Sequence, residues 1–338
     1  MSPETPEALE AQLAEFRSRF HGLMAQIQRA IVGYEQLITD CLVALFSQGH
    51  VLLEGVPGIG KTYLVRVISR VLGLTFGRVQ CTPDLMPADI LGTHIVGEDG
   101  SGRRVFRFEK GPVFKHLLLV DEINRATPKT QAALLEVMQE RCVTAGGERF
   151  EVPLPFFVLA TQNPIEMEGT YPLPEAQLDR FFFKLRVPFP DLEELVEISR
   201  RTTGFKEPGL EVVMGGPELI AMQELLTRVP IADPLTAYAA SLVLATHPER
   251  HDAPKKVARY VAYGASPRGL QALVRGGRAH CALAGRTAVS VADIQRVARD
   301  ALRDRVILNF KGEAEAVDVD RLIDEIVELV STPSREAA

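Results

Sequence analysis

The segment GVPGIGKT at residues 55–62 constrains the fold more than any other part of the chain, because it has the spacing G-x-x-x-x-G-K-[ST]. It follows an apolar run at residues 50–54 and opens a helical pattern at residues 61–72. Glycines allow backbone N–H groups to surround phosphate oxygens, and a helix N-terminus adds partial positive charge. The sequence therefore predicts a phosphate-binding loop, with the members Gly55, Val56, Pro57, Gly58, Ile59, Gly60, Lys61, Thr62 and Tyr63.

Two residues of this loop have specific roles in the prediction. The Lys61 ammonium would reach the β- and γ-phosphates, and the Thr62 hydroxyl would bind Mg²⁺. The matching acidic element is LLLVDE at residues 117–122, where four apolar residues place two carboxylates at the end of a buried strand. Asp121 would complete the Mg²⁺ site, and Glu122 would polarise a water for attack on the γ-phosphate. A solvated pair of surface carboxylates is the alternative.

Short apolar runs alternate with helical patterns between residues 50 and 188. This alternation predicts a parallel sheet with helices on both faces, because parallel strands need crossover connections and are buried on both sides. The expected strands cover residues 50–54, 76–80, 117–120, 156–160 and 181–185, and the expected helices cover 61–72 and 130–140. Glycine-rich tips between alternating residues also predict two projecting β-hairpins, at 94–108 and 141–152.

The strand pattern ends near residue 188, where the prolines at 188–190 predict a hinge. Helical periodicity follows, at residues 192–203, 217–229, 234–247, 267–283 and 291–306. The first 30 residues predict an amphipathic helix that packs on the first domain. We therefore expect four segments: the N-terminal helix at 1–30, an α/β core at 31–188, a helical domain at 189–330 and a frayed tail at 331–338.

The composition is typical of a folded cytoplasmic protein of about two domains. Of the 338 residues, 46% are hydrophobic and 24% charged, and no apolar run approaches the ~20 residues of a membrane span. The acidic N-terminus lacks the apolar core of a signal peptide, and the four cysteines have no metal-ligand spacing. A net charge of −6 argues against bulk nucleic-acid binding.

Five segments, in order, resemble the MoxR family of AAA+ ATPases: GVPGIGKT, LLLVDEINRA, VLATQNP, YPLPEAQLDRF and GASPRG. The similarity runs from about residue 31 to residue 308. It implies an α/β fold, namely the AAA+ αβα P-loop core with a parallel sheet and β-hairpin insertions, followed by a smaller all-α lid domain. It also implies an ATPase that binds ATP and Mg²⁺.

The resemblance implies roles for three further residues. Asn163 matches the sensor 1 position, which orients the attacking water beside Glu122. Arg180 matches the arginine finger, which acts on the γ-phosphate of the neighbouring subunit, and Arg268 matches sensor 2, which links the lid to the nucleotide. From the residues alone, Asn163 could cap a turn, Arg180 could form a surface salt bridge, and Arg268 could be an ordinary first-turn arginine.

The resemblance also implies an adenine-binding segment, a ring assembly and protein partners. The segment at residues 31–34, with Val32 and Gly33, matches the part that covers the adenine, and Arg125 is a candidate for a second arginine acting in trans. AAA+ proteins that use such arginines assemble, so we expect a homo-hexamer whose two hairpins face the central pore. MoxR proteins are thought to mature client complexes, often metal-containing enzymes, together with a von Willebrand factor A domain partner.

Three other functions share parts of this pattern. A magnesium-chelatase ATPase subunit has overlapping motifs, but DEINR and LPEAQLDRF fit MoxR better. A nucleic-acid translocase would use similar hairpins, and the first hairpin is basic between residues 103 and 110, although its tip at 98–99 is acidic. A scaffold that binds ATP without hydrolysing it is disfavoured by the intact set of Lys61, the acidic pair and Asn163.

Overall fold

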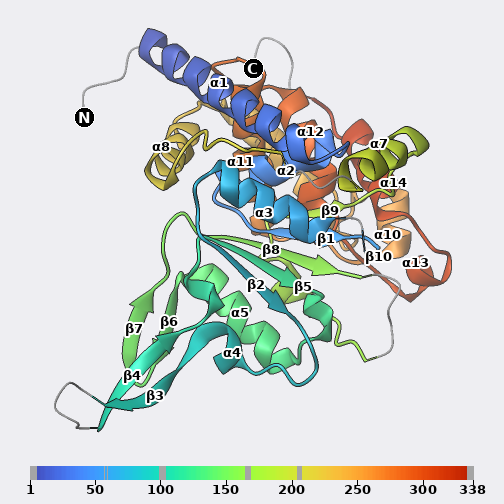
Figure 1. Cartoon of the computed structure of the whole chain (residues 1–338). Helices are drawn as coiled ribbons and strands as arrows, with labels where there is room; N and C mark the ends of the chain where they lie inside the picture. Colours follow the sequence, from blue (N-terminus) through green and yellow to red (C-terminus); the bar gives the residue numbers. More distant parts are fainter. Residues whose placement is uncertain are drawn as a thin grey trace.

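The computed structural model describes residues 6–56, 58, 60–98, 104–163, 169–203 and 208–332. A five-stranded parallel sheet with the order β2-β5-β8-β1-β9 lies at its centre (Figure 1). The strands are β1 Val51–Glu54, β2 Phe76–Gln80, β5 Leu117–Asp121, β8 Phe157–Gln162 and β9 Phe183–Arg186. Every strand predicted for the sheet is present, and the parallel pairing confirms the predicted α/β core.

Helices cover both faces of this sheet, as the continuous apolar runs predicted. Alternate strand residues point to opposite faces, so the neighbours Leu52 and Leu53 belong to two different apolar clusters. The helices on the side of Leu52 are α4 Pro87–Leu91 and α5 Pro128–Glu140, and those on the side of Leu53 are α2 Glu35–Phe46 and α3 Lys61–Val71 (Figure 1).

The N-terminal helix α1, Pro6–Ala30, contacts more of the molecule than the sequence predicted. Its apolar stripe packs on α2 and α3, and also on the lid helices α8 Gly216–Thr227 and α11 Pro267–Leu283. Helical spacing identifies the apolar side of a helix but not the elements that cover it. As a result, α1, one face of the sheet and the lid share a continuous apolar cluster.

The lid is helical, as predicted, and contains one short β-ribbon that was not predicted. Strand β10, Val261–Tyr263, pairs antiparallel with β11, Ile307–Leu308. The other helices of the lid are α7 Leu192–Thr202, α9 Asp233–Leu244, α10 Lys255–Tyr260, α12 Val291–Leu302, α13 Phe310–Ala314 and α14 Val319–Leu329. Over the described ranges, no helix combines the length and apolar character needed to cross a membrane.

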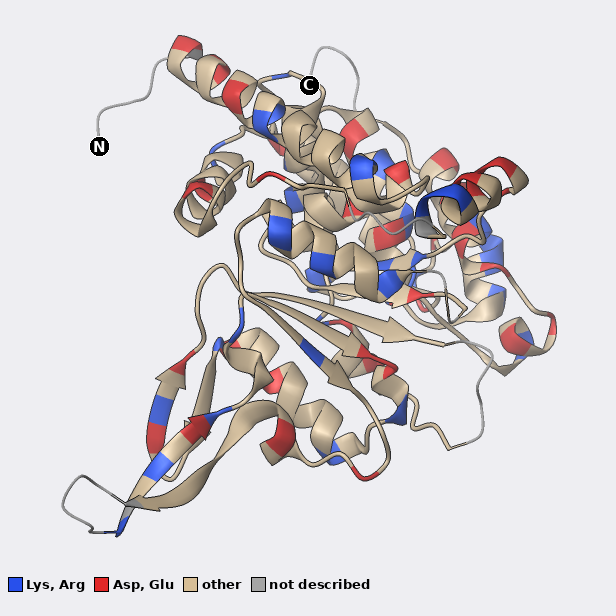
Figure 2. Cartoon of the chain, viewed as in Figure 1, with Lys and Arg blue, Asp and Glu red and all other residues tan. Residues whose placement is uncertain are grey.

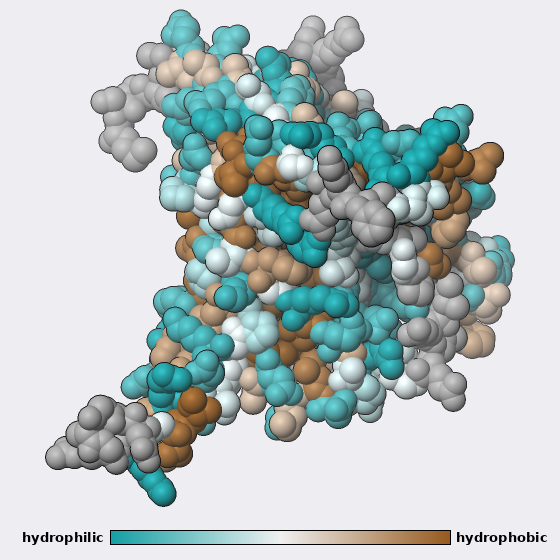
Figure 3. All heavy atoms as spheres, viewed as in Figure 1, coloured by the Kyte–Doolittle hydropathy of each residue, from teal (hydrophilic) through white to brown (hydrophobic). Residues whose placement is uncertain are grey.

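Two antiparallel hairpins project from the core, as predicted, and they pack on each other. They are β3 Gly92–Glu98 with β4 Arg104–Lys110, and β6 Cys142–Ala145 with β7 Glu148–Glu151. The rings of Phe108 and Phe150 stack between them with centroids 4.3 Å apart. Both signs of charge occur along the hairpins (Figure 2), and the arm also carries apolar surface, drawn in brown (Figure 3). Val96 and Phe106 are paired across the first hairpin, and both are exposed. Residues 99–103, which include the predicted tip, lie outside the described residues.

His50 connects three elements of the core at the start of β1. Its Nδ1 accepts a hydrogen bond from the Val158 N–H at 3.0 Å, and its Nε2 donates to the Met138 carbonyl oxygen at 3.2 Å. The neutral ring with its proton on Nε2 satisfies both bonds. Burial lowers the pKa of His50 from its ordinary value of 6.5 to about 4.

We expect acid to destabilise the fold through His50 between about pH 6.5 and pH 4, because the unfolded ring takes up a proton that the folded ring excludes. The folded pKa lies below the unfolded one, so the stabilisation is complete above pH 6.5 and is lost, by roughly 3 kcal/mol, as the pH falls to 4. Urea midpoints measured across this range, for the wild type and for His50→Gln, check the expectation. Parallel pH curves for the two proteins would contradict it.

Candidate functional site

The phosphate loop leaves β1 and leads into α3, as the sequence predicted. Gly58 and Gly60 have φ values of 83° and 81°, a left-handed backbone that glycine adopts at little cost. Val56 is half-buried. Two predicted members of the loop, Pro57 and Ile59, lie outside the described residues. The local conformation thus explains why this segment needs glycine at two of its positions.

Lys61 begins α3 and turns its side chain back to the loop. The ammonium donates a hydrogen bond to the Gly55 carbonyl oxygen at 2.7 Å. Burial lowers the pKa of Lys61, and the negative charges of Asp121 and Glu122 act in the opposite direction. The three charged groups therefore share one small region at the carboxyl edge of the sheet.

The acidic pair lies beside the phosphate loop. Asp121 Oδ2 is 3.4 Å from the Thr62 hydroxyl, and Oδ1 is 3.4 Å from the Thr161 hydroxyl. Hydroxyl and carboxylate oxygens are the hard ligands that Mg²⁺ prefers, so Thr62 and Asp121 fit this ion. Glu122 has φ = 56°, a strained conformation that costs about 1–3 kcal/mol. Its N–H donates to Thr161 Oγ1 at 2.8 Å, which helps to hold that conformation.

A polar network that the sequence analysis missed connects the two carboxylates. Arg78 Nε donates to Asp121 Oδ2 at 2.7 Å, and its Nη2 donates to Gln80 Oε1 at 3.0 Å. Glu122 Oε2 accepts from Gln80 Nε2 at 2.9 Å and from Arg125 Nη1 at 3.1 Å. The spacing of Arg78 and Gln80 puts both on one face of β2, but only the pairing of β2 with β5 brings them to the acidic pair. Arg125 thus contacts its own chain, and its role in trans stays a prediction.

Asn163 lies at the same edge of the sheet. It is 5% exposed and directly follows β8, the strand that pairs in parallel with β5. The carboxyl ends of neighbouring parallel strands meet at one edge, so Asn163 and Asp121 are close in the fold although they are far apart in the sequence. This is the arrangement expected of a residue that orients water beside Glu122.

A cavity of ≈ 390 Å³ adjoins the phosphate loop on the side of α7. Its lining is mainly apolar and includes Val32, Lys61 and Tyr63. Gly33 is not part of the lining; its φ of 69° is a left-handed backbone conformation that favours glycine, and the Glu194 side chain of α7 lies close to it. An apolar cavity of this size suits the planar base of a nucleotide.

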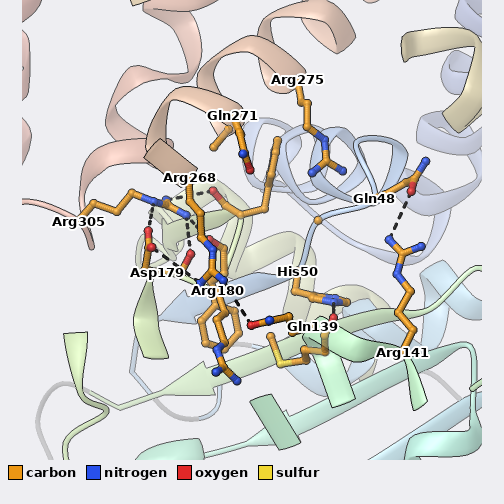
Figure 4. A pocket seen from close by; sticks show the side chains of 15 residues that line it. Gln48, His50, Gln139, Arg141, Asp179, Arg180, Arg268, Gln271, Arg275 and Arg305 are labelled. Atoms are coloured by element: carbon orange, nitrogen blue, oxygen red, sulfur yellow. Dashed lines mark hydrogen bonds and ion pairs between the residues drawn. The ribbon is translucent and has the colours of Figure 1, made fainter. Parts of the chain in front are cut away.

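Arg180 and Arg268 lie together in a second cavity, of ≈ 180 Å³ (Figure 4). This cavity is at the opposite end of β1 from the phosphate loop. His50, directly before β1, lines this cavity, whereas Gly55, directly after β1, begins the phosphate loop. Five residues of extended chain span about 16 Å, which exceeds the length of an arginine side chain. Arg268 instead pairs with Asp179 at 3.8 Å. The structure therefore does not bring Arg268 beside the phosphate loop of its own chain.

The lid fixes the segment that carries Arg180. Arg305, whose side chain is 2% exposed, donates from Nε to Asp179 Oδ1 at 2.8 Å. Its Nη2 donates to the carbonyl oxygens of Asp179 and Phe181, on either side of Arg180. The Ser266 hydroxyl also contacts both Asp179 carboxylate oxygens, each at 2.8 Å. Sequence reasoning missed Arg305, because it lies more than a hundred residues from the segment that it holds.

Comparison with known proteins agrees with this geometry. The family model of the "ATPase family associated with various cellular activities (AAA)" matches residues 50–183, and that of the "AAA lid domain" matches residues 254–326. "Chaperone MoxR1" of Mycobacterium tuberculosis is 44% identical over 312 residues, which cover 92% of this chain and 82% of that protein. The chain belongs to the MoxR family of AAA ATPases.

Other relatives of this MoxR-family chain match over nearly its whole length. "Protein MoxR" of Methylorubrum extorquens is 32% identical over 341 residues, covering 96% of this chain and 98% of that protein. The crystal structure of a Cytophaga hutchinsonii protein assigned as an ATPase superposes with a TM-score of 0.91 at 36% identity, covering 97% and 99% of the two chains. The resemblance found in the sequence, the AAA+ core with a helical lid, and the ATPase activity are thereby confirmed.

The MoxR-family assignment also confirms that the chain binds a nucleotide. It does not test the roles of single residues, so the roles of Glu122, Asn163, Arg180 and Arg268 stay predictions. Among the residues that the structure describes, no group of three or more His, Cys, Asp or Glu side chains is placed to hold a metal ion.

Proposed function

We propose that this chain is an ATP-hydrolysing chaperone that works as a homo-hexameric ring. The observation that supports a ring is the separation of the two halves of its site. The phosphate loop and Glu122 lie at one end of β1, and Arg180 and Arg268 lie at the other. A complete site therefore needs two copies in head-to-tail contact, and repetition of such a contact closes into a ring.

In the proposed reaction, ATP and water give ADP and phosphate. The N–H groups of the phosphate loop and the Lys61 ammonium bind the phosphates. Thr62 and Asp121 would hold Mg²⁺, which supplies positive charge to the phosphate oxygens when it is bound. The Glu122 carboxylate accepts a proton from the attacking water, and Asn163 fixes the position of that water.

The neighbouring subunit completes the site. Its Arg180 guanidinium offsets the negative charge that develops on the transferred phosphoryl group, and its Arg268 contacts the same phosphates. In the cavity, Arg305 holds the backbone around Arg180 in place, so little reorganisation is needed when the subunits meet. We expect the base to occupy the cavity that Val32 and Tyr63 line.

We propose that hydrolysis remodels a client protein complex. The relative from Mycobacterium tuberculosis bears the name of a chaperone, and the exposed pair Val96 and Phe106 gives the hairpin arm an apolar surface for a client. A cytoplasmic setting, a von Willebrand factor A domain partner and metal-containing clients complete the proposal. The alternatives are a magnesium-chelatase subunit and a nucleic-acid translocase, and no observation favours either of them. A translocase would need free basic groups on the hairpin, but Arg107 is paired with Glu109 at 3.1 Å.

The division into a core at 31–188 and a lid at 189–330 belongs to this proposal. We expect the prolines at 188–190 to allow small adjustments between them. Because α1, the sheet and the lid share one apolar cluster, a wide opening would expose buried apolar surface. Movement between whole subunits is therefore the main motion that we propose.

The ring is tested by measuring ATPase rate per subunit against protein concentration, with the mass of the assembly measured with and without nucleotide. We expect the rate per subunit to rise with concentration and to follow the amount of a hexamer-sized species, because each site needs a neighbour. A rate per subunit that is independent of concentration in a monomeric protein would exclude the shared site.

A further inference from the structure

The cavity that holds Arg180 and Arg268 carries an excess of positive charge. Among the described residues that line it, five are arginines and one, Asp179, is acidic (Figure 4). Asp179 is already in contact with Arg305 and Arg268. Within the described part of the chain, no carboxylate forms an ion pair with the other three, Arg141, Arg180 and Arg275.

Arg275 is held in the cavity by uncharged partners. On α11 it lies seven residues after Arg268, which places both on one side of the helix. Its guanidinium donates to the Ser47 carbonyl oxygen at the end of α2 and lies 5.5 Å from the centre of the Phe182 ring. Burial lowers the pKa of Arg275, and the charge of Arg141 lowers it further. The fold therefore fixes this cation without neutralising it.

The two other arginines without a carboxylate partner in the described part of the chain are Arg141 and Arg180. Among the described residues, the Arg141 guanidinium donates to one side chain, from Nη2 to Gln48 Oε1 at 3.3 Å. The Nε–H of Arg180 is buried and has no acceptor among the described residues. A buried donor without an acceptor lowers stability, and a buried charge without a counter-ion lowers it further. An anion in the cavity would remove both penalties.

We propose that this cavity is a receptor for a phosphate-type oxyanion, and that Arg275 and Arg141 contact the anion beside Arg180 and Arg268. Planar guanidinium groups bind phosphate oxygens in pairs, which suits a small cavity lined by several of them. The anion is either the terminal phosphate of a nucleotide on a neighbouring copy or free phosphate. Only the first source rests on the ring proposed above.

Free phosphate is tested with the full chain carrying Lys61→Ala, which removes the ammonium of the nucleotide site. Calorimetric titration with inorganic phosphate and with pyrophosphate should detect binding that Arg275→Gln weakens by about tenfold or more. Arg278→Gln is the matched control: it lies three residues further along α11, outside this cavity, and should leave binding unchanged. Equal thermal midpoints for the variants exclude misfolding as the cause.

The nucleotide of a neighbour is tested by mixing subunits. Arg275→Gln should lower the ATPase rate, and mixing it with Glu122→Gln subunits should restore activity, because the second variant supplies an intact cavity. Recovery on mixing assigns the anion to the neighbour's nucleotide, and phosphate binding without recovery assigns it to free phosphate. If neither occurs while Arg180→Ala is rescued by mixing, the cavity proposal is overturned and the ring stands. If Arg180→Ala is not rescued either, the ring proposal fails independently.

Discussion

Replacement of Arg180 by alanine is expected to lower the ATPase rate by about 10³–10⁵-fold, with little change in ATP binding. Arg180 lies at the end of β1 remote from the phosphate loop of its own chain, so its loss leaves the binding half of the site intact. What is lost is the positive charge that a neighbour adds in the transition state. Single-turnover hydrolysis and fluorescent-nucleotide binding measure the two effects separately.

Mixing distinguishes an action in trans from a local structural effect. Arg180→Ala subunits have an intact acidic pair, and Glu122→Gln subunits have an intact Arg180, so some contacts between them contain one complete site. We expect neither variant alone to hydrolyse ATP well and the mixture to recover a fraction of the wild-type rate. Arg250→Ala is the control, since Arg250 pairs with exposed Asp252 and a surface pair contributes little. No recovery on mixing would argue against the shared site.

Replacement of Glu122 by glutamine is expected to lower hydrolysis by about 10²–10⁴-fold while ATP still binds. The amide is nearly the same size but cannot accept a proton from water. Glutamine can keep a hydrogen bond from Arg125, which now reaches Oε2 at 3.1 Å, so the strained backbone should persist. We expect ATP to accumulate in the variant and to stabilise the assembled ring.

Two measurements check the expected effect of Glu122→Gln. Rapid-quench measurement of ADP formation gives the chemical step, and light scattering gives the mass of the ATP-bound assembly. Glu136→Gln is a matched control on α5, because Glu136 is exposed and outside the site. Undiminished turnover in Glu122→Gln would remove its assignment as the base. A comparable loss in Glu136→Gln would point instead to a general effect on folding.

The part of the candidate site that could be predicted consists of short contiguous signals. The phosphate loop needs glycine at φ values near +80° and a lysine at the start of a helix. Residues 55–62 can therefore be identified from the sequence before the fold is known. The acidic pair could also be predicted, because the apolar run before it indicates a buried strand that ends at Asp121. The network of Arg78 and Gln80 was missed, because a polar residue on a strand has no visible function until the neighbouring strand is known.

The sequence by itself determined the nucleotide chemistry, the α/β core and the MoxR family, because each depends on residues that are close together in the chain. The tertiary structure decided the separation of the site into two halves. Arg180 and Arg268 are 88 positions apart in the sequence and meet only because α11 of the lid packs against the segment before β9. The direction of β1 then puts them and the phosphate loop at opposite ends of one strand. That arrangement is set by strand order and helix packing, which no local pattern encodes.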